Sequence, residues 1–385
     1  MKTKLVDFTK SLIERKSITP LDDGAINVLK KKLNKLGFIN TELLFESKNS
    51  EKVLNLFSVT KKKEKNTKVL CFAGHTDVVP PGKLEDWKYH PFEGKTTKDK
   101  IYGRGASDMK GAIAAWVNAC ENVLKKHKLN FSLALMITGD EEGVAENGTI
   151  KIVSWLKRNK IKIDHCIVGE PTNPNFIGEM VKIGRRGSLS LKIKIIGSPG
   201  HVAYPHLAKN PLYAVGKISN DLNNLKLNKV SRNFPISNLE ITSIDTGNKA
   251  SNVIPSSSEI SLNIRYNTRY NDKEILEKIK RICGKYDCLF SIKIISNNKP
   301  FYTQPDEFVK NFVKSVKKVT GKTPSLSTTG GTSDARFIKD ICPVIEFGAV
   351  GKTMHKVNEN VFIKDLVALQ KIYETFILEY NKICK

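Results

Sequence analysis

The chain has 385 residues and a mass of 43.1 kDa, which is long for one compact core and favours two domains. Hydrophobic residues make up 40% of it, and no run approaches the roughly 20 apolar residues of a membrane span. No apolar stretch follows the N-terminal "MKTKLVDFTK", so we expect a cytoplasmic protein with no membrane partner.

The formal net charge is +25, from 64 basic and 39 acidic side chains. Such an excess is often found in nucleic-acid-binding proteins. Here the lysines are spread over expected helix faces and loops, with little aromatic interleaving and no recognisable nucleic-acid motif. We therefore expect a solvated surface with no nucleic-acid partner, whose charge helps to attract a small anionic substrate.

The seven cysteines are odd in number and scattered, and they form no C-x-x-C pair. Several of them lie in apolar or amphipathic segments, as reduced core cysteines do. We expect none of them to be catalytic or to bind a metal.

The N-terminal half alternates expected helices with short apolar strands. Apolar residues at helical spacing predict two helices, over residues 5–13 and 26–36. Five further elements follow in order: a strand at 68–75, a helix at 109–127, a strand at 131–139, a helix at 150–159 and a strand at 164–170. This alternation predicts an α/β fold with a mostly parallel sheet and helices on both faces.

From about residue 186 the pattern changes to that of half-exposed antiparallel strands. "GSLSLKIKIIG" alternates apolar and polar residues strictly and "SEISLNIRYN" nearly so, with helical stretches at 210–225 and 271–286. Helix-type patterning returns after "NNKPFYTQPDEF". We therefore expect an α+β domain, residues 186–298, inserted into a discontinuous catalytic domain, residues 1–185 and 299–385.

Polar side chains follow the expected strands where each one ends. His75 and Asp77 lie in "GHTDVVPPG", Glu141 and Glu142 in "TGDEEG", and Glu170 in "VGEPT". The carboxyl ends of parallel strands form one rim of the sheet, where ligands bind. Asp108, in the glycine-flanked "GRGASDMKGA" at the start of a long helix, is expected to reach the same rim.

Each residue alone has a structural explanation. His75 fits a hydrogen-bonded core histidine, Asp108 a helix N-cap, Glu170 a surface acid before a turn and Asp140 a turn residue. Together these explanations fail for the carboxylates at the rim, because they would repel one another unless cations compensated for their charge.

Two metal ions would resolve this repulsion. With the histidine of "GAVGKTMHKVNEN", the candidate ligands are His75, Asp108, Glu142, Glu170 and His355. Two histidines and three carboxylates are too many for one tetrahedral ion but suit two ions that share Asp108. The mixed nitrogen and oxygen set favours two zinc ions, with cobalt or manganese as substitutes.

Glu141 is then left beside a ligand but free of the metals. It is placed to take a proton from a metal-bound water, as general base. Asp77 is expected to accept the other ring N–H of His75 and so to fix its tautomer.

The ordered motifs resemble those of the M20 family of dinuclear zinc amidohydrolases and peptidases, over essentially the whole chain. They are "GHTDVVPPG", "GRGASDMKGA", "TGDEEG", "VGEPT", "GRRGSLS", "GSPGHVAYPH", "NVIP", "GGTSDARF" and "MHKVNE". The resemblance implies that His75 and Glu170 hold one zinc, that Glu142 and His355 hold the other, and that Asp108 bridges the two. It also implies a cis peptide bond between Asp108 and Met109.

The same resemblance implies that Glu141 activates a metal-bridging hydroxide and later protonates the leaving amine. The inserted domain is implied to be a lid and homodimer interface, with His201 reaching the partner's active site to polarise the scissile amide. Substrate carboxylates and amides are assigned by the resemblance to Arg185, Tyr204, Asn252, Arg265, Gly331 and Thr332.

Within the family, "GRRGSLS", "GHVAYPHLAKNP" and "STTGGTSDARF" are most similar to members that hydrolyse N-succinyl-LL-2,6-diaminopimelate to succinate and LL-2,6-diaminopimelate. An acetylornithine deacetylase or an aminoacylase is the alternative, since such an enzyme would share every metal ligand and differ only in the substrate pocket. In either case the expected partner is a small anionic N-acyl amino acid.

Overall fold

The computed structural model describes residues 2–48, 50–60 and 67–384. Its internal contacts divide the chain into two compact units. Unit 1 comprises Met1–Ile183, Thr303–Ser327 and Ser333–Lys385, and unit 2 comprises Gly184–Tyr302 and Thr328–Thr332. The predicted insertion, residues 186–298, lies within unit 2, which also takes in a short segment from later in the chain.

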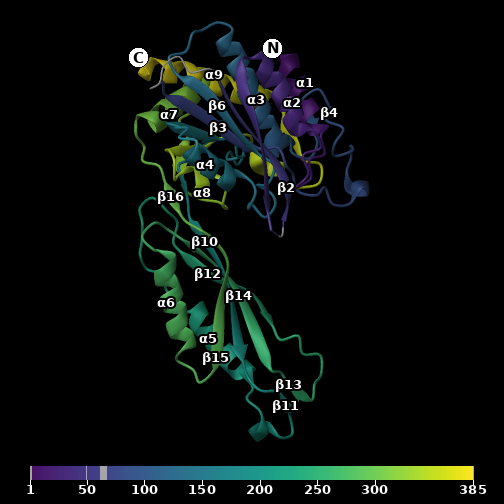
Figure 1. Cartoon of the computed structure of the whole chain (residues 1–385), viewed down its shortest axis with the longest axis vertical. Coiled ribbons are helices and arrows are strands. Elements are labelled where there is room, and N and C mark those ends of the chain that lie inside the picture. Colours follow the sequence, from purple (N-terminus) through teal and green to yellow (C-terminus); the bar gives the residue numbers. More distant parts are fainter. Residues whose placement is uncertain (1, 49, 61–66, 385) are drawn as a thin grey trace. The chain divides into compact units, whose positions relative to one another are not determined.

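Unit 1 is built on a mixed eight-stranded sheet (Figure 1). In spatial order its strands are β1 (Phe38–Ser47), β2 (Ser50–Thr60), β6 (Ser132–Thr138), β3 (Val69–His75), β7 (His165–Val168), β18 (Val344–Glu346), β8 (Met180–Lys182) and β17 (Ser325–Ser327). Neighbours from β6 to β18 run parallel, as do β8 and β17. The predicted strands are present, and the predicted α/β class with a mostly parallel sheet is confirmed.

The antiparallel hairpin β1–β2 at the sheet edge was not predicted. The burial of β1 does not alternate regularly, because its two buried residues, Phe38 and Leu43, are five positions apart. No short Asn-Gly or Asp-Gly turn marks the connection either. The partner strand β6 pairs with β2 through tertiary contact, which local patterning does not reveal.

The helices of unit 1 cover both faces of the sheet. They are α1 (Lys2–Ile13), α2 (Ala25–Lys35), α3 (Gly111–Leu124), α4 (Thr149–Arg158), α7 (Glu307–Thr320), α8 (Ala335–Ile338) and α9 (Ile363–Ile383). Phe72 of β3 stacks on Trp116 of α3, whereas Phe57 of β2 contacts Trp155 of α4. Because the register aligns Phe72 and Phe57 with successive residues of β6, these two helices lie on opposite faces.

Local sequence explains where α7 begins and ends. The Asp306 side chain accepts the N–H of Val309, which satisfies one of the amides that a helix start leaves free. At the other end Gly321 adopts φ 73°, a left-handed conformation that favours glycine.

Smaller elements complete unit 1. A three-stranded sheet consists of β4 (Lys95–Thr96), β5 (Lys100–Tyr102) and β19 (Asn360–Phe362). Short helical turns are η1 (Leu84–Asp86), η2 (Ala106–Lys110) and η4 (Gly351–Thr353). Of the helices described in either unit, none combines the length and apolar character that crossing a membrane requires.

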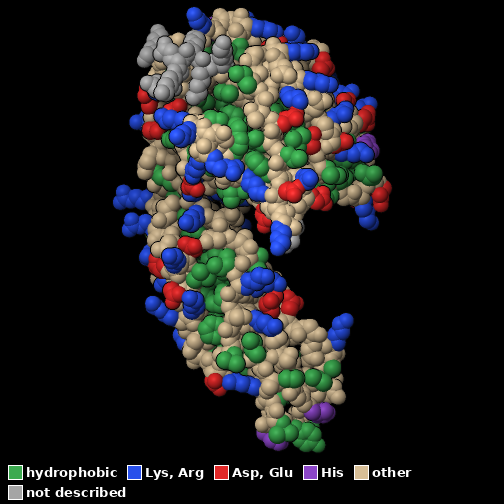
Figure 2. Space-filling model, viewed as in Figure 1, with side chains coloured by type: hydrophobic (Ala, Val, Ile, Leu, Met, Phe, Trp, Pro, Cys, Tyr) green, Lys and Arg blue, Asp and Glu red, His purple; other side chains and the backbone are tan. Residues whose placement is uncertain are grey.

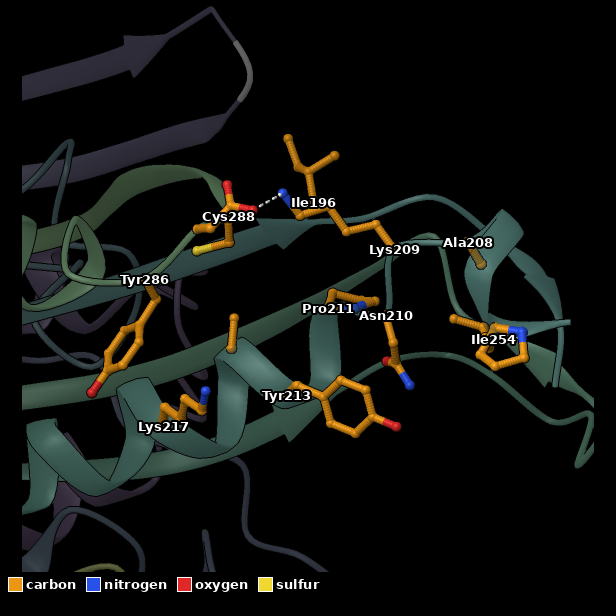
Figure 3. Close-up of a pocket in the computed structure, with 13 residues that line it drawn as sticks. Ile196, Ala208, Lys209, Asn210, Pro211, Tyr213, Lys217, Ile254, Tyr286 and Cys288 are labelled. Carbon is orange, nitrogen blue, oxygen red and sulfur yellow. Dashed lines mark hydrogen bonds and ion pairs between the residues drawn. The ribbon is translucent and has the colours of Figure 1, made fainter.

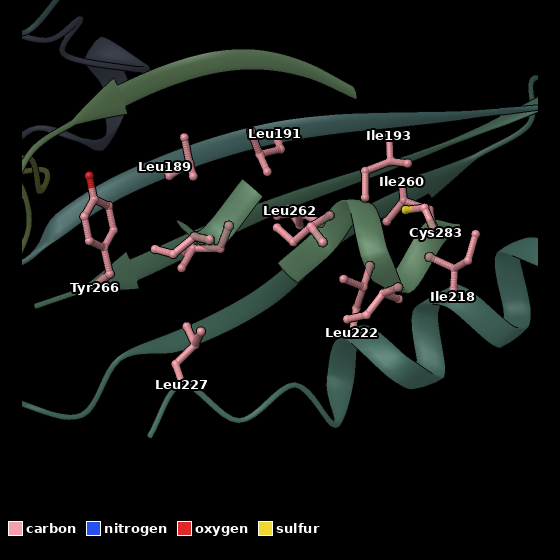
Figure 4. Close-up of a cluster of buried hydrophobic side chains, with 14 of the residues drawn as sticks. Leu189, Leu191, Ile193, Ile218, Leu222, Leu227, Ile260, Leu262, Tyr266 and Cys283 are labelled. Carbon is pink, nitrogen blue, oxygen red and sulfur yellow. The ribbon is translucent and has the colours of Figure 1, made fainter. Parts of the chain in front are cut away.

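Unit 2 contains an antiparallel sheet in the order β12 (Asn238–Asp245), β14 (Ser257–Tyr266), β10 (Gly187–Ile196), β15 (Leu289–Asn298). The helices α5 (Pro211–Asn223) and α6 (Asp272–Cys283) pack on one face, with short elements β9 (Gly184–Arg185), β11 (Gly200–His201), η3 (Pro205–Leu207), β13 (Val253–Ile254) and β16 (Phe301–Tyr302). Figure 4 shows the core between sheet and helices, to which the alternate residues Leu189, Leu191 and Ile193 of β10 contribute. The alternation seen in the sequence is therefore the period of a sheet with one buried face.

Charged side chains of both signs lie on the surface. Figure 2 shows lysine and arginine side chains distributed over the face in view, with acidic side chains between them. Many of the lysines form surface ion pairs, including those of Lys30 with Glu42 and Lys229 with Glu274. Such exposed pairs contribute little to stability.

Candidate metal centre and active site

The ends of three neighbouring strands supply most of the predicted ligands. His75 is the last residue of β3, Glu141 and Glu142 follow β6, and Glu170 follows β7. Because β3 runs parallel to both β6 and β7, these ends lie at the same edge of the sheet. The structure brings their side chains together with those of Asp108 and His355, in groups whose potential ligand atoms lie within 4.8 Å of one another.

Asp108 occupies the centre of these groups. Its Oδ1 lies 3.2 Å from Nε2 of His75, and its Oδ2 lies 3.2 Å from Nε2 of His355. The two oxygens of one carboxylate therefore face two different histidines. This is the arrangement that a carboxylate bridging two cations requires.

A second carboxylate completes each side. Glu170 Oε1 lies 4.0 Å from the ring of His75, and Glu142 Oε1 lies 2.8 Å from Nε2 of His355. The groups His75–Asp108–Glu170 and Asp108–Glu142–His355 are thus each one histidine and two carboxylates. A third combination, His75 with Glu141 and Glu142, is also close enough to hold an ion.

The electrostatics of these residues fit cations between them. Hydrogen bonds that the imidazole donates to the carboxylates of Asp108 and Glu142 raise the pKa of His355 to about 10. Burial opposes a charge on His75, but Asp108 outweighs it and raises the pKa of that imidazole as well. The carboxylates around the two imidazoles thus favour positive charge at this site. Neutral imidazole and carboxylate ligands suit zinc and related divalent ions.

The backbone around two ligands is unusual. The peptide bond between Asp108 and Met109 is cis, as the family resemblance implied. His355 adopts φ 61°, in the left-handed region that residues other than glycine rarely occupy. A left-handed conformation at a residue other than glycine costs of order 1–3 kcal/mol and persists where surrounding contacts enforce it.

Asp77 contacts His75 differently from the prediction. Nδ1 of His75 hydrogen-bonds the main-chain carbonyl of Asp77 at 2.9 Å, while the Asp77 carboxylate is 3.7 Å away. That carboxylate instead accepts the backbone N–H groups of Glu141, at 3.3 Å, and Glu142, at 2.9 Å. Asp77 thus fixes the His75 tautomer through its carbonyl and holds the acidic turn through its side chain. Burial raises the pKa of Asp77 to about 6.

Glu141 lies beside the candidate ligands, and its carboxylate is close to those of other acidic residues, including Glu170. Burial and the neighbouring Glu170 raise its pKa well above the usual value. A raised pKa suits a residue that must both accept and donate a proton near neutral pH. Asp140, by contrast, accepts the N–H groups of Ala145 and Asn147, so its interpretation as a turn residue is confirmed.

Two further residues hold the site together and were not identified from the sequence. Glu359 Oε1 accepts the backbone N–H groups of Ser107, at 2.9 Å, and Asp108, at 3.1 Å, and its Oε2 accepts Nη1 of Arg104 at 2.8 Å. Arg104 also donates to the carbonyl of His355 at 3.4 Å. One buried ion pair therefore ties the Asp108 turn to the segment that carries His355. Both residues lie in the quoted motifs, "GRGASD" and "MHKVNE", but only tertiary structure reveals that they meet.

The residues predicted to bind substrate or polarise its amide lie in unit 2. His201 is exposed, and its Nδ1 accepts the N–H of Ala203 at 3.1 Å. An Nδ1 that accepts leaves the proton on Nε2, so the free side of the ring is a hydrogen-bond donor. Tyr204 packs near this ring, with centroids 5.9 Å apart, and Asn252 is exposed on the turn before β13.

Two arginines of unit 2, Arg185 and Arg265, are predicted to bind substrate carboxylates. Nη1 of Arg185 donates to the carbonyl of Thr329 at 3.4 Å, next to the predicted Gly331 and Thr332. Gly330 adopts φ 100°, a backbone conformation that favours glycine, and a Cβ there would displace the end of the Arg185 side chain. Burial lowers the pKa of Arg265 without removing its charge. Planar guanidinium groups in a glycine-rich setting suit bidentate recognition of carboxylates.

Unit 2 also has a pocket of about 340 Å³ between α5 and the end of β10 (Figure 3). Tyr213, Lys217 and Tyr286 line it, and Lys209 forms an ion pair with Asp287 at 2.9 Å on its wall. None of the predicted substrate residues belongs to its described lining.

The fold and the paired ligand groups define a protein of the metallohydrolase type. Residues 71–379 match the peptidase family M20/M25/M40, and the chain belongs to this family.

Comparison with individual proteins gives the same family. The chain is 48% identical to the succinyl-diaminopimelate desuccinylase of Pelagibacter ubique, over 97% of this chain and 98% of that protein. It is 45% identical to the succinyl-diaminopimelate desuccinylase of Methylorubrum extorquens, over 95% of this chain and 96% of that protein. Among solved structures, an M20 family metallo-carboxypeptidase from Sulfolobus solfataricus has the same fold, with a TM-score of 0.79 and 21% identity over 98% of this chain and 99% of that one.

Proposed function

We propose that the protein hydrolyses the amide of N-succinyl-LL-2,6-diaminopimelate and releases succinate and LL-2,6-diaminopimelate. The observation that carries the chemistry is the position of Asp108 between two histidines, each with its own further carboxylate. The substrate is supported by similarity at 48% and 45% identity, over nearly the whole chain, to proteins named for this reaction.

Two zinc ions are the proposed cofactors. His75 and Glu170 would hold one, Glu142 and His355 would hold the other, and Asp108 would bridge them. Bound there, the metals would supply Lewis acidity, which lowers the pKa of water and neutralises developing negative charge. Cobalt and manganese bind the same types of ligand atom.

The proton transfers are assigned to Glu141. Its carboxylate takes a proton from the attacking water and delivers it to the amine that leaves, so that one residue serves both half-reactions. Asp77 holds the main chain of this residue by accepting the backbone N–H of Glu141, and it fixes the tautomer of His75 through its carbonyl. Water adds across the amide bond, and no other reactant is consumed.

Unit 2 is proposed to bind the substrate. Its arginines, Arg185 and Arg265, pair with the substrate carboxylates, while Tyr204, Asn252, Gly331 and Thr332 bind carboxylate and amide groups. The Nε2–H of His201 is a donor, as required to polarise the scissile carbonyl.

We further propose that the enzyme is a homodimer formed through unit 2, with His201 serving the partner's site. The strand β15 is at the edge of its sheet, and its Leu289, Ile294 and Ile295 are 71%, 46% and 50% exposed. An apolar edge strand of this kind is a hazard for a monomer and a suitable surface for pairing. Light scattering is expected to give twice the chain mass of 43.1 kDa, and half that value for Ile295→Lys. A wild-type mass of 43.1 kDa would reject the dimer.

A cytoplasmic location is also proposed. The seven cysteines are all free, and most are buried, as in proteins of a reducing compartment.

The test of function is amine release by the zinc-loaded protein. N-succinyl-LL-2,6-diaminopimelate and N-acetylornithine are supplied separately at equal concentration, each with a chelated control. Metal-dependent preference for the succinylated substrate supports the proposal. Preference for the acetylated substrate would leave the proposed chemistry unchanged and favour the acetylornithine deacetylase or aminoacylase alternative. Activity that survives complete metal removal would refute the mechanism.

A further inference from the structure

Unit 1 has a lysine-lined pocket that the proposed reaction does not use. It has a volume of about 530 Å³ and is formed by η4, β19, the first turn of α9, Lys100 of β5 and the segment 175–176. None of the candidate metal ligands belongs to its described lining. The proposed reaction therefore does not explain why these residues line a common pocket.

The lining is strongly basic. Four lysines, Lys100, Lys352, Lys356 and Lys364, face one carboxylate, that of Asp365. Four positive charges against one negative charge leave a formal excess of +3. Within the part of the chain that the structure describes, none of these lysines forms an ion pair, although many lysines elsewhere on the surface do.

Two of these positive groups lie close to each other. Nζ of Lys100 lies 4.5 Å, and Nζ of Lys364 5.4 Å, from the centroid of the same Phe362 ring. Their separation cannot exceed the sum of these distances, which is within about one screening length, roughly 10 Å, at 0.1 M salt. The ring offsets part of the repulsion through cation–π attraction. An anion in the pocket would offset the rest.

The start of α9 adds to this potential. Phe362 precedes the helix in an extended conformation, the N–H of Ile363 donates to the carbonyl of Asp99 at 2.8 Å, and no side chain caps the first turn. The first N–H groups of a helix have no intrahelical partner, and the helix dipole places positive charge there. Lys364 and Asp365 belong to this turn and also line the pocket.

The residue types favour phosphate over carboxylate. Lysine ammonium groups are common phosphate ligands, and a phosphate monoester places close to two negative charges on one group, where a carboxylate has one, so it offsets more of the charge of the four lysines. The pocket is also larger than a single phosphate ion, and the rings of Phe176 and Phe362, 41% and 39% exposed, provide apolar walls. We propose that this pocket binds a small organic phosphate, with the phosphate among the lysines and the organic part against the rings.

The experiment measures binding of AMP to the zinc-loaded full-length protein by isothermal titration calorimetry. The test variant is Lys100→Gln/Lys364→Gln. The control, Lys126→Gln/Lys128→Gln, removes the same charge near the far end of α9, where Asn381 bonds the Lys128 carbonyl. Asn381 is 18 positions along the helix from Ile363, which is about 27 Å at 1.5 Å per residue.

AMP is expected to bind the wild type and the control variant equally, and to bind the test variant about tenfold or more weakly because two charged contacts are lost. Inorganic phosphate is expected to compete with AMP, whereas adenosine and succinate are not. Absence of AMP binding to the wild type would overturn the proposal. Undiminished binding to the test variant would also overturn it, because AMP would then bind at the metal centre. Equal competition by succinate would overturn it as well.

Discussion

Glu359→Gln tests whether one buried ion pair supports the metal centre. The substitution keeps the shape of the side chain and one oxygen, which can still accept the N–H groups of Ser107 and Asp108. It removes the charge that faces Arg104, whose side chain is 3% exposed, while that of Glu359 is fully buried. The Arg104 guanidinium is then left buried without its counter-ion, although it retains hydrogen bonds to backbone carbonyls.

The expected loss of stability is about 3 kcal/mol, at the lower end of the range for breaking a buried pair, because those carbonyl contacts remain. Unfolding of the about 260 residues of unit 1 has an entropy near 0.5 kcal/mol/K, so this loss corresponds to a fall in Tm of about 6 °C. Since Glu359 also holds the Asp108 turn, we expect fewer bound metal ions per chain and a matching loss of turnover.

Thermal unfolding is measured on metal-free protein, and metal content separately by elemental analysis. The control is Glu42→Gln, which breaks the exposed Lys30–Glu42 pair and is expected to cost under about 1 kcal/mol. If Glu359→Gln unfolds within about 1 °C of the wild type and keeps its full metal content, the structural role assigned to this residue is wrong.

The remaining predictions concern the metals and the base. Glu141→Gln should retain both metals but lose turnover by about a thousandfold or more, whereas Glu146→Gln, an exposed residue of the same turn, should leave kcat unchanged. Metal loss from the first variant, measured by elemental analysis, would contradict the assignment of Glu141 as base. His355→Ala should lose chiefly one metal per chain, because Asp108 and Glu142 alone remain on that side. Chelation should inactivate the enzyme, and added zinc should restore activity; loss that zinc cannot reverse would indicate unfolding instead.

The order of motifs along the chain was enough to predict the class of fold, which the structure confirms, and to propose a ligand set, whose members the structure brings close together. Short apolar runs followed by acidic or histidine residues mark buried parallel strands whose ends meet. His75, Glu142 and Glu170 are examples, since each lies at or just after the end of a strand found as predicted. The roles of Arg185, His201 and the other unit 2 residues stay predictions, which rest on family resemblance.

Tertiary structure alone decided how these residues are supported. Glu359 and Arg104 are 255 positions apart, and no local pattern indicates that they pair beneath Asp108. Likewise, the carboxylate of Asp77 holds the Glu141 turn and only its carbonyl contacts His75, because side-chain geometry depends on the loops around it. The sequence by itself determined which chemical groups meet at the sheet edge. Only the packing of distant segments determined which atom of each group faces the candidate metal site and which holds its neighbours.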